Sequence, residues 1–201
     1  MDKVLNELYI SVDLETAGDN PLDFTILNVG MVAYAVDPQR RRKVGELSVN
    51  MIPGTPDPKQ VEWWNSTPKL KAIYESFAVD AKSPDVAMVE IRDWLAAVRQ
   101  GYEHVYMVAC PTIFDGTFLL TYWFNFLPST TIRGTGMFHM IDVRSYGAGR
   151  LGCSLSEANK TKAFAPYMPD PEAYPHTHTG VDDAEEQLLL LFNLMDLRKN
   201  M

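Results

Sequence analysis

The sequence predicts a mixed α/β fold, in which three antiparallel strands open a sheet, parallel strands extend it, and helices flank it. Three short apolar and β-branched segments come first, and turn residues join them as in a strand meander. Helical segments then alternate with short apolar runs, and a strongly apolar helix closes the chain. This order of elements is typical of a mixed sheet that is covered by helices.

The opening strands are predicted from short apolar runs that turn residues bound, over 8–14, 26–36 and 44–52. A polar turn, Gly18 to Asp23, joins the first two strands, and Asp37-Pro38-Gln39 supplies the turn before the third. The basic run Arg40–Lys43 then falls at a hairpin end. We interpret this run as solvated rather than phosphate-binding, because it lies far in sequence from every acidic motif; a role at an interface stays open.

Helices alternate with strands in the rest of the chain. Helix starts are predicted at Ser66-Thr67-Pro68 and Ser83-Pro84, where proline takes the first helical position. The second of these helices runs to about Arg99. The later elements are expected to be a strand at 105–109, a helix at 115–127, a strand at 138–143, a loop at 166–175 and a helix at 182–197. No linker interrupts the 201 residues, so one domain over 1–201 is predicted.

The composition predicts a cytoplasmic globular protein, with 46% hydrophobic and 22% charged residues. No apolar run approaches the roughly 20 residues that span a bilayer. Met1-Asp2-Lys3-Val4 lacks the basic segment and apolar continuation of a signal peptide. Cys110 and Cys153 lack metal-ligand spacing, so we expect buried free thiols in a reducing compartment rather than a disulfide.

The net charge of −8 at pH 7 argues against one mode of nucleic-acid binding, the gripping of long duplexes. Proteins that grip long duplexes neutralise many phosphates and are usually basic. An acidic chain can still hold a few nucleotides at a strand end, with metal ions binding the phosphates. The charge therefore restricts a nucleic-acid substrate to short contacts without excluding it.

Asp13 and Glu15 lie two residues apart at the end of the first predicted strand. Side chains alternate faces along a strand, so both carboxylates point the same way, about 7 Å apart. Like charges this close are costly unless cations neutralise them. Two solvated surface acids are the alternative, but the preceding run Tyr9–Val12 is typical of a buried strand, so the pair emerges from the core.

Further candidates stand at helix starts. Asp115 begins the helix after the fourth strand, where a capping role is the alternative to metal binding. His178 lies in a glycine-containing loop, five residues before Asp183 in the first turn of the closing helix. A histidine, whose pKa lies near neutrality, suits a general base, and a surface histidine beside a capping aspartate is the alternative. His176 and Asp182 are the competitors in this stretch.

Together and in this order, the motifs resemble those of the DEDDh branch of the DnaQ-like, ribonuclease H-like 3′–5′ exonucleases. Asp13-Leu14-Glu15 is similar to that family's first motif, Asp115 to the second, and His178 with Asp183 to the third, His-x4-Asp. The spacing of the third motif gives the histidine role to His178 rather than His176. The resemblance implies a ribonuclease H-like mixed sheet.

The resemblance covers nearly the whole chain, from about Tyr9 to Leu191. The segment 26–32 looks like the family's second strand, and Val61-Glu62-Trp63-Trp64 looks like the paired tryptophans of the phage DexA, exonuclease VIII and mycobacterial exoribonuclease-like group. One departure is Ala109-Cys110-Pro111-Thr112, where close relatives often carry Gly or Asn. This departure affects the part of the substrate-binding surface next to Asp115, but Asp115 itself is present.

The resemblance implies an enzyme that hydrolyses terminal phosphodiesters of single-stranded DNA or RNA from the 3′ end. Two divalent cations would be bound by the family's four acids, here Asp13, Glu15, Asp115 and Asp183. Oxygen ligands favour Mg²⁺ or Mn²⁺ over zinc. His178 would take the proton of an attacking water, and a metal would stabilise the departing 3′ oxygen. Dimers occur in this family, so a homodimer is a further expectation.

Trp63 and Trp64 are candidates to stack on bases near the 3′ end, worth about 1–3 kcal/mol per base. Because they are adjacent on a helix, we expect one to face the substrate and the other the core, and Trp63 is favoured for the substrate. Phe114 could stack in the same way or pack in the core. A non-catalytic binding module on the same fold is the alternative function, but such a module needs no general base such as His178.

Overall fold

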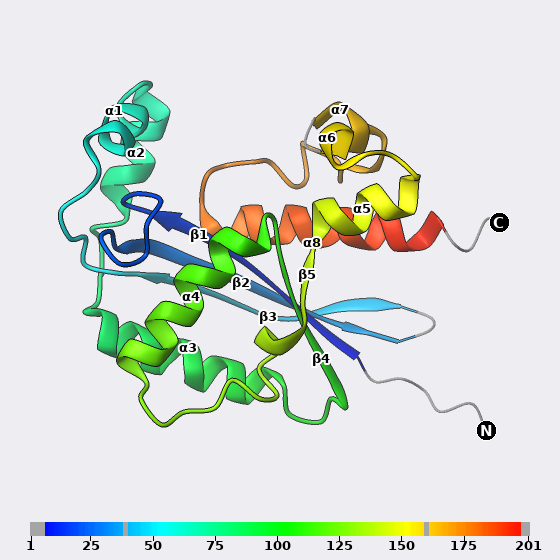
Figure 1. Cartoon of the computed structure of the whole chain (residues 1–201), viewed down its shortest axis with the longest axis horizontal. Helices are drawn as coiled ribbons and strands as arrows, with labels where there is room; N and C mark the ends of the chain where they lie inside the picture. The colour runs from blue at the N-terminus through cyan, green and yellow to red at the C-terminus, as the bar shows by residue number, and fades with distance from the viewer. Residues whose placement is uncertain (1–6, 38–39, 159–160, 198–201) are drawn as a thin grey trace.

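The protein is described by a computed structural model over residues 7–37, 40–158 and 161–197 (Figure 1). A five-stranded sheet in the order β3-β2-β1-β4-β5 forms its centre. The strands are β1 Glu7–Thr16, β2 Ile26–Val36, β3 Arg41–Asn50, β4 His104–Ala109 and β5 Met140–Asp142. The first three strands pair antiparallel, whereas β4 pairs in parallel with both β1 and β5. The predicted mixed α/β sheet is confirmed.

Helices cover both faces of this sheet. They are α1 Pro58–Trp64, α2 Pro68–Ser76, α3 Pro84–Val98, α4 Thr112–Phe126, α5 Val143–Leu151, α6 Leu155–Ala158, α7 Thr161–Phe164 and α8 Gly180–Asp196, with the 3-10 turns η1 Met137–His139 and η2 Ala165–Tyr167. One hydrophobic cluster joins the sheet to α3 and α4, and another joins it to α5 and α8. Figure 1 shows α3 and α4 crossing the near side of the sheet.

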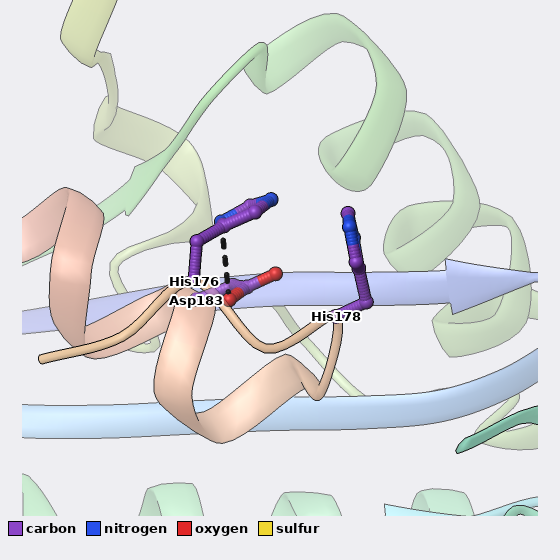
Figure 2. Close-up of side chains that lie close together, drawn as sticks. All are labelled: His176, His178 and Asp183. Atoms are coloured by element: carbon purple, nitrogen blue, oxygen red, sulfur yellow. Dashed lines mark ion pairs between the residues drawn. The ribbon is translucent and has the colours of Figure 1, made fainter. Parts of the chain in front are cut away.

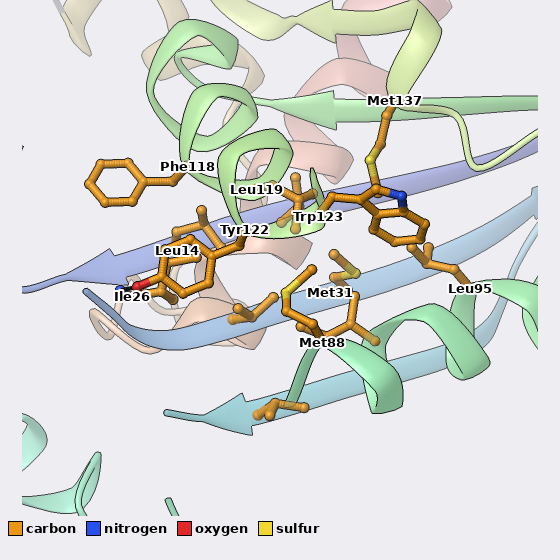
Figure 3. Packing of buried hydrophobic residues seen from close by; sticks show 14 of the residues in the cluster. Leu14, Ile26, Met31, Met88, Leu95, Phe118, Leu119, Tyr122, Trp123 and Met137 are labelled. Atoms are coloured by element: carbon orange, nitrogen blue, oxygen red, sulfur yellow. Dashed lines mark hydrogen bonds between the residues drawn. The ribbon is translucent and has the colours of Figure 1, made fainter. Parts of the chain in front are cut away.

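The central strand β1 is buried on both sides, and its side chains alternate between the helices that cover the two faces of the sheet. Leu8, Ile10, Val12 and Leu14 pack in the cluster with α3 and α4, part of which Figure 3 shows. Tyr9 faces the other way, with its ring centre 5.6 Å from that of Phe192 in α8. The odd-numbered positions of β1 therefore point toward α8, and these include the two acids of the first motif.

Several boundaries differ from the predicted ones. Helix α4 begins at Thr112 rather than residue 115, and the strand expected over 138–143 is only Met140–Asp142, because η1 precedes it and α5 begins at Val143. The sequence analysis missed α5, α6 and α7. Helix α5 contains two glycines, which weaken its helical pattern, and the Asp142 side chain caps it by accepting a hydrogen bond from the Ser145 backbone N–H.

The basic run at 40–43 is only partly solvated. Arg41 is half-buried, with its guanidinium paired to both carboxylate oxygens of Asp196 at 2.8 Å and lying 4.5 Å from the centre of the Phe192 ring. Lys43 is exposed but pairs with Glu185 of α8 at 2.8 Å. The expectation of a purely solvated run is wrong for Arg41, because this side chain ties β3 to α8.

The remaining expectations concern the termini, one turn and the cysteines. Residues 1–6 and the turn residues Pro38 and Gln39 lie outside the described residues. Within the described ranges, no helix has both the length and the apolar character to cross a membrane. Cys110 and Cys153 are free thiols, as predicted, but both are half-buried rather than buried.

Candidate active site

The first motif lies near the end of β1, on the face that α8 covers. Asp13 and Glu15 pair with Gly30 and Asn28 of β2, and strand geometry continues to Thr16. Both carboxylates therefore point to the same side of the sheet, as the alternation of side chains requires.

Two glycines let the start of α8 approach this motif. A Cβ atom on Gly30 would lie 1.8 Å from the carbonyl carbon of Gly180, and one on Gly180 would lie 2.6 Å from the Gly30 nitrogen. The Gly180 N–H donates to Asn28 Oδ1 at 3.1 Å. About two turns further along α8, the Gln187 side-chain amide donates to the Ser11 hydroxyl at 2.9 Å. The sequence analysis assigned no role to these polar residues, although the glycines are the visible signal of a close approach.

This packing brings the first and third motifs together. One carboxylate oxygen from each of Asp13, Glu15 and Asp183 lies within 4.8 Å of the others. Asp115, from α4, accepts a hydrogen bond from the Leu14 N–H at 3.1 Å, which places it beside Asp13 but outside this group of three. Asp115 is 2% exposed and lies inside α4, whose N-cap is Pro111. The capping interpretation of Asp115 is therefore wrong.

The electrostatics of these acids fit a site for cations. Burial raises the pKa of Glu15 to about 9, with help from the charges of Asp13 and Asp183. Burial likewise raises the pKa of Asp115 to about 7, although the hydrogen bond from the Leu14 N–H lowers this pKa. The pKa of Asp13 is raised well above its ordinary value by burial and then by Asp115 and Asp183. Crowded, buried oxygen ligands of this kind fit divalent cations, which would relieve the repulsion between them.

The two histidines of the loop before α8 differ in charge state. His176 Nδ1 lies 3.2 Å from Asp183 Oδ1 and 3.0 Å from Glu186 Oε2, and these hydrogen bonds raise the pKa of His176 to about 10 (Figure 2). Burial lowers the pKa of His178, and the charge of His176 lowers it further. His178 is therefore neutral near pH 7 and able to accept a proton, whereas His176 is charged. The sequence analysis did not single out Glu186.

The loop holds His178 in an unusual conformation. Its φ is +61°, in the left-handed region, and its ring centre lies 4.5 Å from that of His176 and 5.4 Å from that of Trp63. The competitor Asp182 is exposed and accepts hydrogen bonds from the hydroxyls of Thr177 and Thr179. Asp182 thus braces the loop, while Asp183 points into the acidic cluster.

The aromatic candidates divide between surface and core. Trp63 is 41% exposed, whereas Trp64 is fully buried and stacks on Tyr74, so one tryptophan faces each way, as predicted. Trp63 and Phe114 both line a groove of about 330 Å³ that is also lined by Glu15. Phe114 is half-buried and packs against Phe118 as well, so it takes part in both the groove and the core.

A larger cavity, of about 1120 Å³, lies at the opposite end of β4. It is lined by residues such as Arg99, His104 and Phe138, from the end of α3, the start of β4 and η1. The carboxylates instead lie toward the carboxyl ends of the parallel strands, where sites usually form in such sheets. The chemistry of the side chains, not the size of the cavity, therefore identifies the candidate site.

Comparison with known proteins supports this assignment. No protein-family model matches the chain. The 3′-5′ DNA exonuclease Cap18 of Escherichia coli is 26% identical over 195 residues, which cover 94% of this chain and 92% of the relative. The resemblance to the DEDDh 3′–5′ exonucleases is confirmed. In sequence and in fold, the chain is similar to DEDDh-type exonucleases.

Solved structures share the fold of this chain at low sequence identity. The nuclease domain of 3′hExo, a DEDDh family member bound to rAMP, matches with a TM-score of 0.64 and 12% identity, over 96% of this chain and 93% of that one. Exonuclease I of E. coli, in complex with a 5cy-dA13 oligonucleotide, matches with a TM-score of 0.63 and 12% identity. The match covers 96% of this chain but only 41% of exonuclease I. These likenesses confirm the ribonuclease H-like sheet.

Proposed function

We propose that this exonuclease hydrolyses the terminal phosphodiester of single-stranded nucleic acid by a two-metal mechanism, with His178 as the general base. The observation that carries the proposal is the convergence of three carboxylates, from Asp13, Glu15 and Asp183, within 4.8 Å at the end of a buried strand. Asp115 stands beside them, held by the Leu14 N–H. Four crowded acids, two of them buried and two half-buried, are costly in a protein that binds no cation.

The four acids divide the work of binding cations. Asp13 has an acid on each side, because its carboxylate groups with those of Glu15 and Asp183 and Asp115 is held by the N–H of the next residue, Leu14. It is therefore our candidate for the ligand shared by two cations, Mg²⁺ or Mn²⁺, with Glu15, Asp115 and Asp183 completing the set. When bound, such cations neutralise the phosphate and the departing 3′ oxygen and lower the pKa of a water.

His178 supplies the acid–base step. Its lowered pKa keeps an imidazole nitrogen free to accept the proton of the attacking water. The water oxygen forms a bond to phosphorus while the bond from phosphorus to the 3′ oxygen of the preceding nucleotide breaks. The products are a mononucleotide and a strand one nucleotide shorter. The contact of the His178 ring with Trp63 helps to aim the imidazole.

The groove lined by Trp63 and Phe114 is the proposed binding site for the terminal bases. Stacking on exposed aromatic rings supplies about 1–3 kcal/mol per base without reading the sequence, and it suits a protein of net charge −8. We propose DNA as the preferred substrate, because the relative that matches over most of both chains is named a DNA exonuclease. RNA remains the comparison, since 3′hExo was solved with rAMP.

The test uses 5′-labelled DNA and RNA oligonucleotides of matched sequence, incubated with Mn²⁺, Mg²⁺ or EDTA. We expect a ladder that shortens from the 3′ end with metal only, faster on DNA, and no cleavage of circular single-stranded DNA. Asp13→Ala and Asp183→Ala should abolish cleavage. His178→Gln should slow it by about 10²- to 10⁴-fold while Mn²⁺ binding persists. Oligonucleotides left intact under every metal, with Asp13→Ala indistinguishable from the parent, would instead favour the binding module.

The remaining parts of the proposal concern the whole protein. We propose that residues 1–201 act as one catalytic domain in the cytoplasm, where a reducing environment suits the free thiols Cys110 and Cys153. The homodimer expected from the family stays a prediction. Light scattering of the purified protein gives the molar mass that tests it.

A further inference from the structure

A second group of metal-binding side chains lies beside the acidic cluster and differs from it in chemistry. His176, His178 and Asp183 each offer one ligand atom, and these three atoms lie within 4.8 Å of one another. Figure 2 shows the three side chains rising from the loop before α8 and from its first turn toward the same side. Asp183 belongs to both groups, whereas the two imidazoles belong only to this one.

The ligand types suit a different metal from Mg²⁺. Two imidazole nitrogens and one carboxylate, with a further position left for water, are a common ligand set for Zn²⁺, whereas Mg²⁺ takes oxygen ligands. In tetrahedral zinc sites with bonds of about 2.0–2.1 Å, neighbouring ligand atoms lie about 3.3 Å apart. The distance from His176 Nδ1 to Asp183 Oδ1 is 3.2 Å, close to that spacing. In the metal-free protein His176 is protonated, so zinc has to displace this proton when it binds Nδ1.

The surroundings hold these ligands in place. The Thr177 N–H donates to Asp183 Oδ1 at 3.0 Å and so fixes this carboxylate in the first turn of α8. The left-handed backbone of His178 turns its ring toward His176, with the ring centres 4.5 Å apart, and Trp63 packs on its other side. Outer contacts of this kind orient metal ligands and strengthen binding.

We propose that His176, His178 and Asp183 form an inhibitory zinc site. Zinc bound there occupies an imidazole nitrogen of His178 and a carboxylate oxygen of Asp183, so neither atom serves the hydrolytic site. Zinc binding itself stands on the ligand geometry alone, while the inhibition rests on the proposed role of His178. His176 is the residue specific to this site, because the spacing of the exonuclease motif selects His178.

Zinc binding is measured first, without nucleic acid, on protein freed of metal by EDTA and dialysis. Zn²⁺ is titrated against a chromophoric chelator, and Co²⁺ serves as a coloured substitute whose visible spectrum reports nitrogen ligands. We expect one tight site in the parent chain. His176→Gln and, separately, His178→Gln should weaken it by more than about 100-fold. His139→Gln, which removes an exposed histidine of η1, is the matched control and should bind zinc as the parent does.

Inhibition is then measured by adding zinc to the Mg²⁺-supported reaction, with each variant compared to its own zinc-free rate. We expect His176→Gln to need about 100-fold more zinc than the parent for half-inhibition. Equal zinc affinity of His176→Gln and the parent would place the ion on carboxylates alone and overturn the site. Weakened binding with unchanged half-inhibition would overturn the inhibitory role. If the protein has no exonuclease activity, the proposed function is wrong, but the zinc-binding measurement still tests the zinc site.

Discussion

The contact between Gly30 and Gly180 leads to a sharp prediction about how the site is assembled. In Gly30→Ala, the added Cβ would lie 1.8 Å from the carbonyl carbon of Gly180, where ordinary contact needs at least 3.4 Å. The start of α8 must therefore retreat by about 1.6 Å, since both partners are backbone and cannot rotate away. The hydrogen bond from Gly180 to Asn28, now 3.1 Å long, would break with this shift.

The consequence for activity follows from what α8 carries. Asp183 lies in the first turn of α8, and His178 lies two residues before α8 begins, whereas Asp13 is on β1 and does not move with the helix. A displacement of about 1 Å in reacting groups can cost about 10²-fold in rate, so kcat/KM should fall by about 100-fold or more. Overpacking costs about 1–3 kcal/mol, which for a chain of this length lowers Tm by about 2–12 °C. The variant should therefore remain folded at 20 °C.

The assay is single-turnover cleavage of a 5′-labelled oligonucleotide in Mn²⁺, with circular dichroism to confirm folding. Gly149→Ala is the matched control, because position 149 of α5 is exposed and the added Cβ meets nothing within 4 Å, so the activity should equal the parent's. Its Tm should rise slightly, as expected for Gly→Ala in a helix. A Gly30→Ala variant with the parent's kcat/KM would refute the claim that this close approach positions the site.

Two further predictions concern charge and aromatic packing. The folded pKa of Glu15, about 9, and that of His176, about 10, both lie above the ordinary values of 4.5 and 6.5, so the folded state binds more protons. Thermal unfolding in EDTA should therefore show Tm falling from about pH 6 to about pH 9, and Glu15→Gln should flatten this slope; a Tm that rises with pH would contradict the assigned shifts. Trp63→Ala should weaken single-strand binding by about 1–3 kcal/mol in a fluorescence titration at unchanged Tm. Trp64→Ala should instead cost about 3–5 kcal/mol of stability, and equal effects of the two substitutions on Tm would contradict the division between surface and core.

The fold was predictable where the sequence pattern is local. The apolar runs of β1 and β2 and the proline starts of α2 and α3 mark elements that form close to the predicted bounds. The bounds of the short strand β5 and the presence of helix α5 were not predictable, because the stability of these elements comes from tertiary contacts. Val143, for example, is buried against α8, and periodicity alone carries no sign of this.

The site was predictable in its residues but not in its internal arrangement. Spacing along β1 is enough to place Asp13 and Glu15 on one face, and motif order suggests Asp115 and Asp183. Sequence spacing does not reveal that His176 forms the ion pair with Asp183, because that contact depends on how the loop folds back over α8. Long-range contacts of this kind follow from packing and cannot be read from periodicity.

The cost of the acidic cluster is the strongest physical argument against a purely binding role. The metal-free fold holds Asp13, Glu15 and Asp115 with raised pKa values, so charging them at neutral pH destabilises it. An amide at any of these positions would keep the size of the side chain and remove the repulsion. A module that only bound nucleic acid would lose nothing by such changes and would gain stability. The cluster is explained when cations bind there and the fold holds a neutral His178 beside it, which is the requirement of hydrolysis rather than of binding.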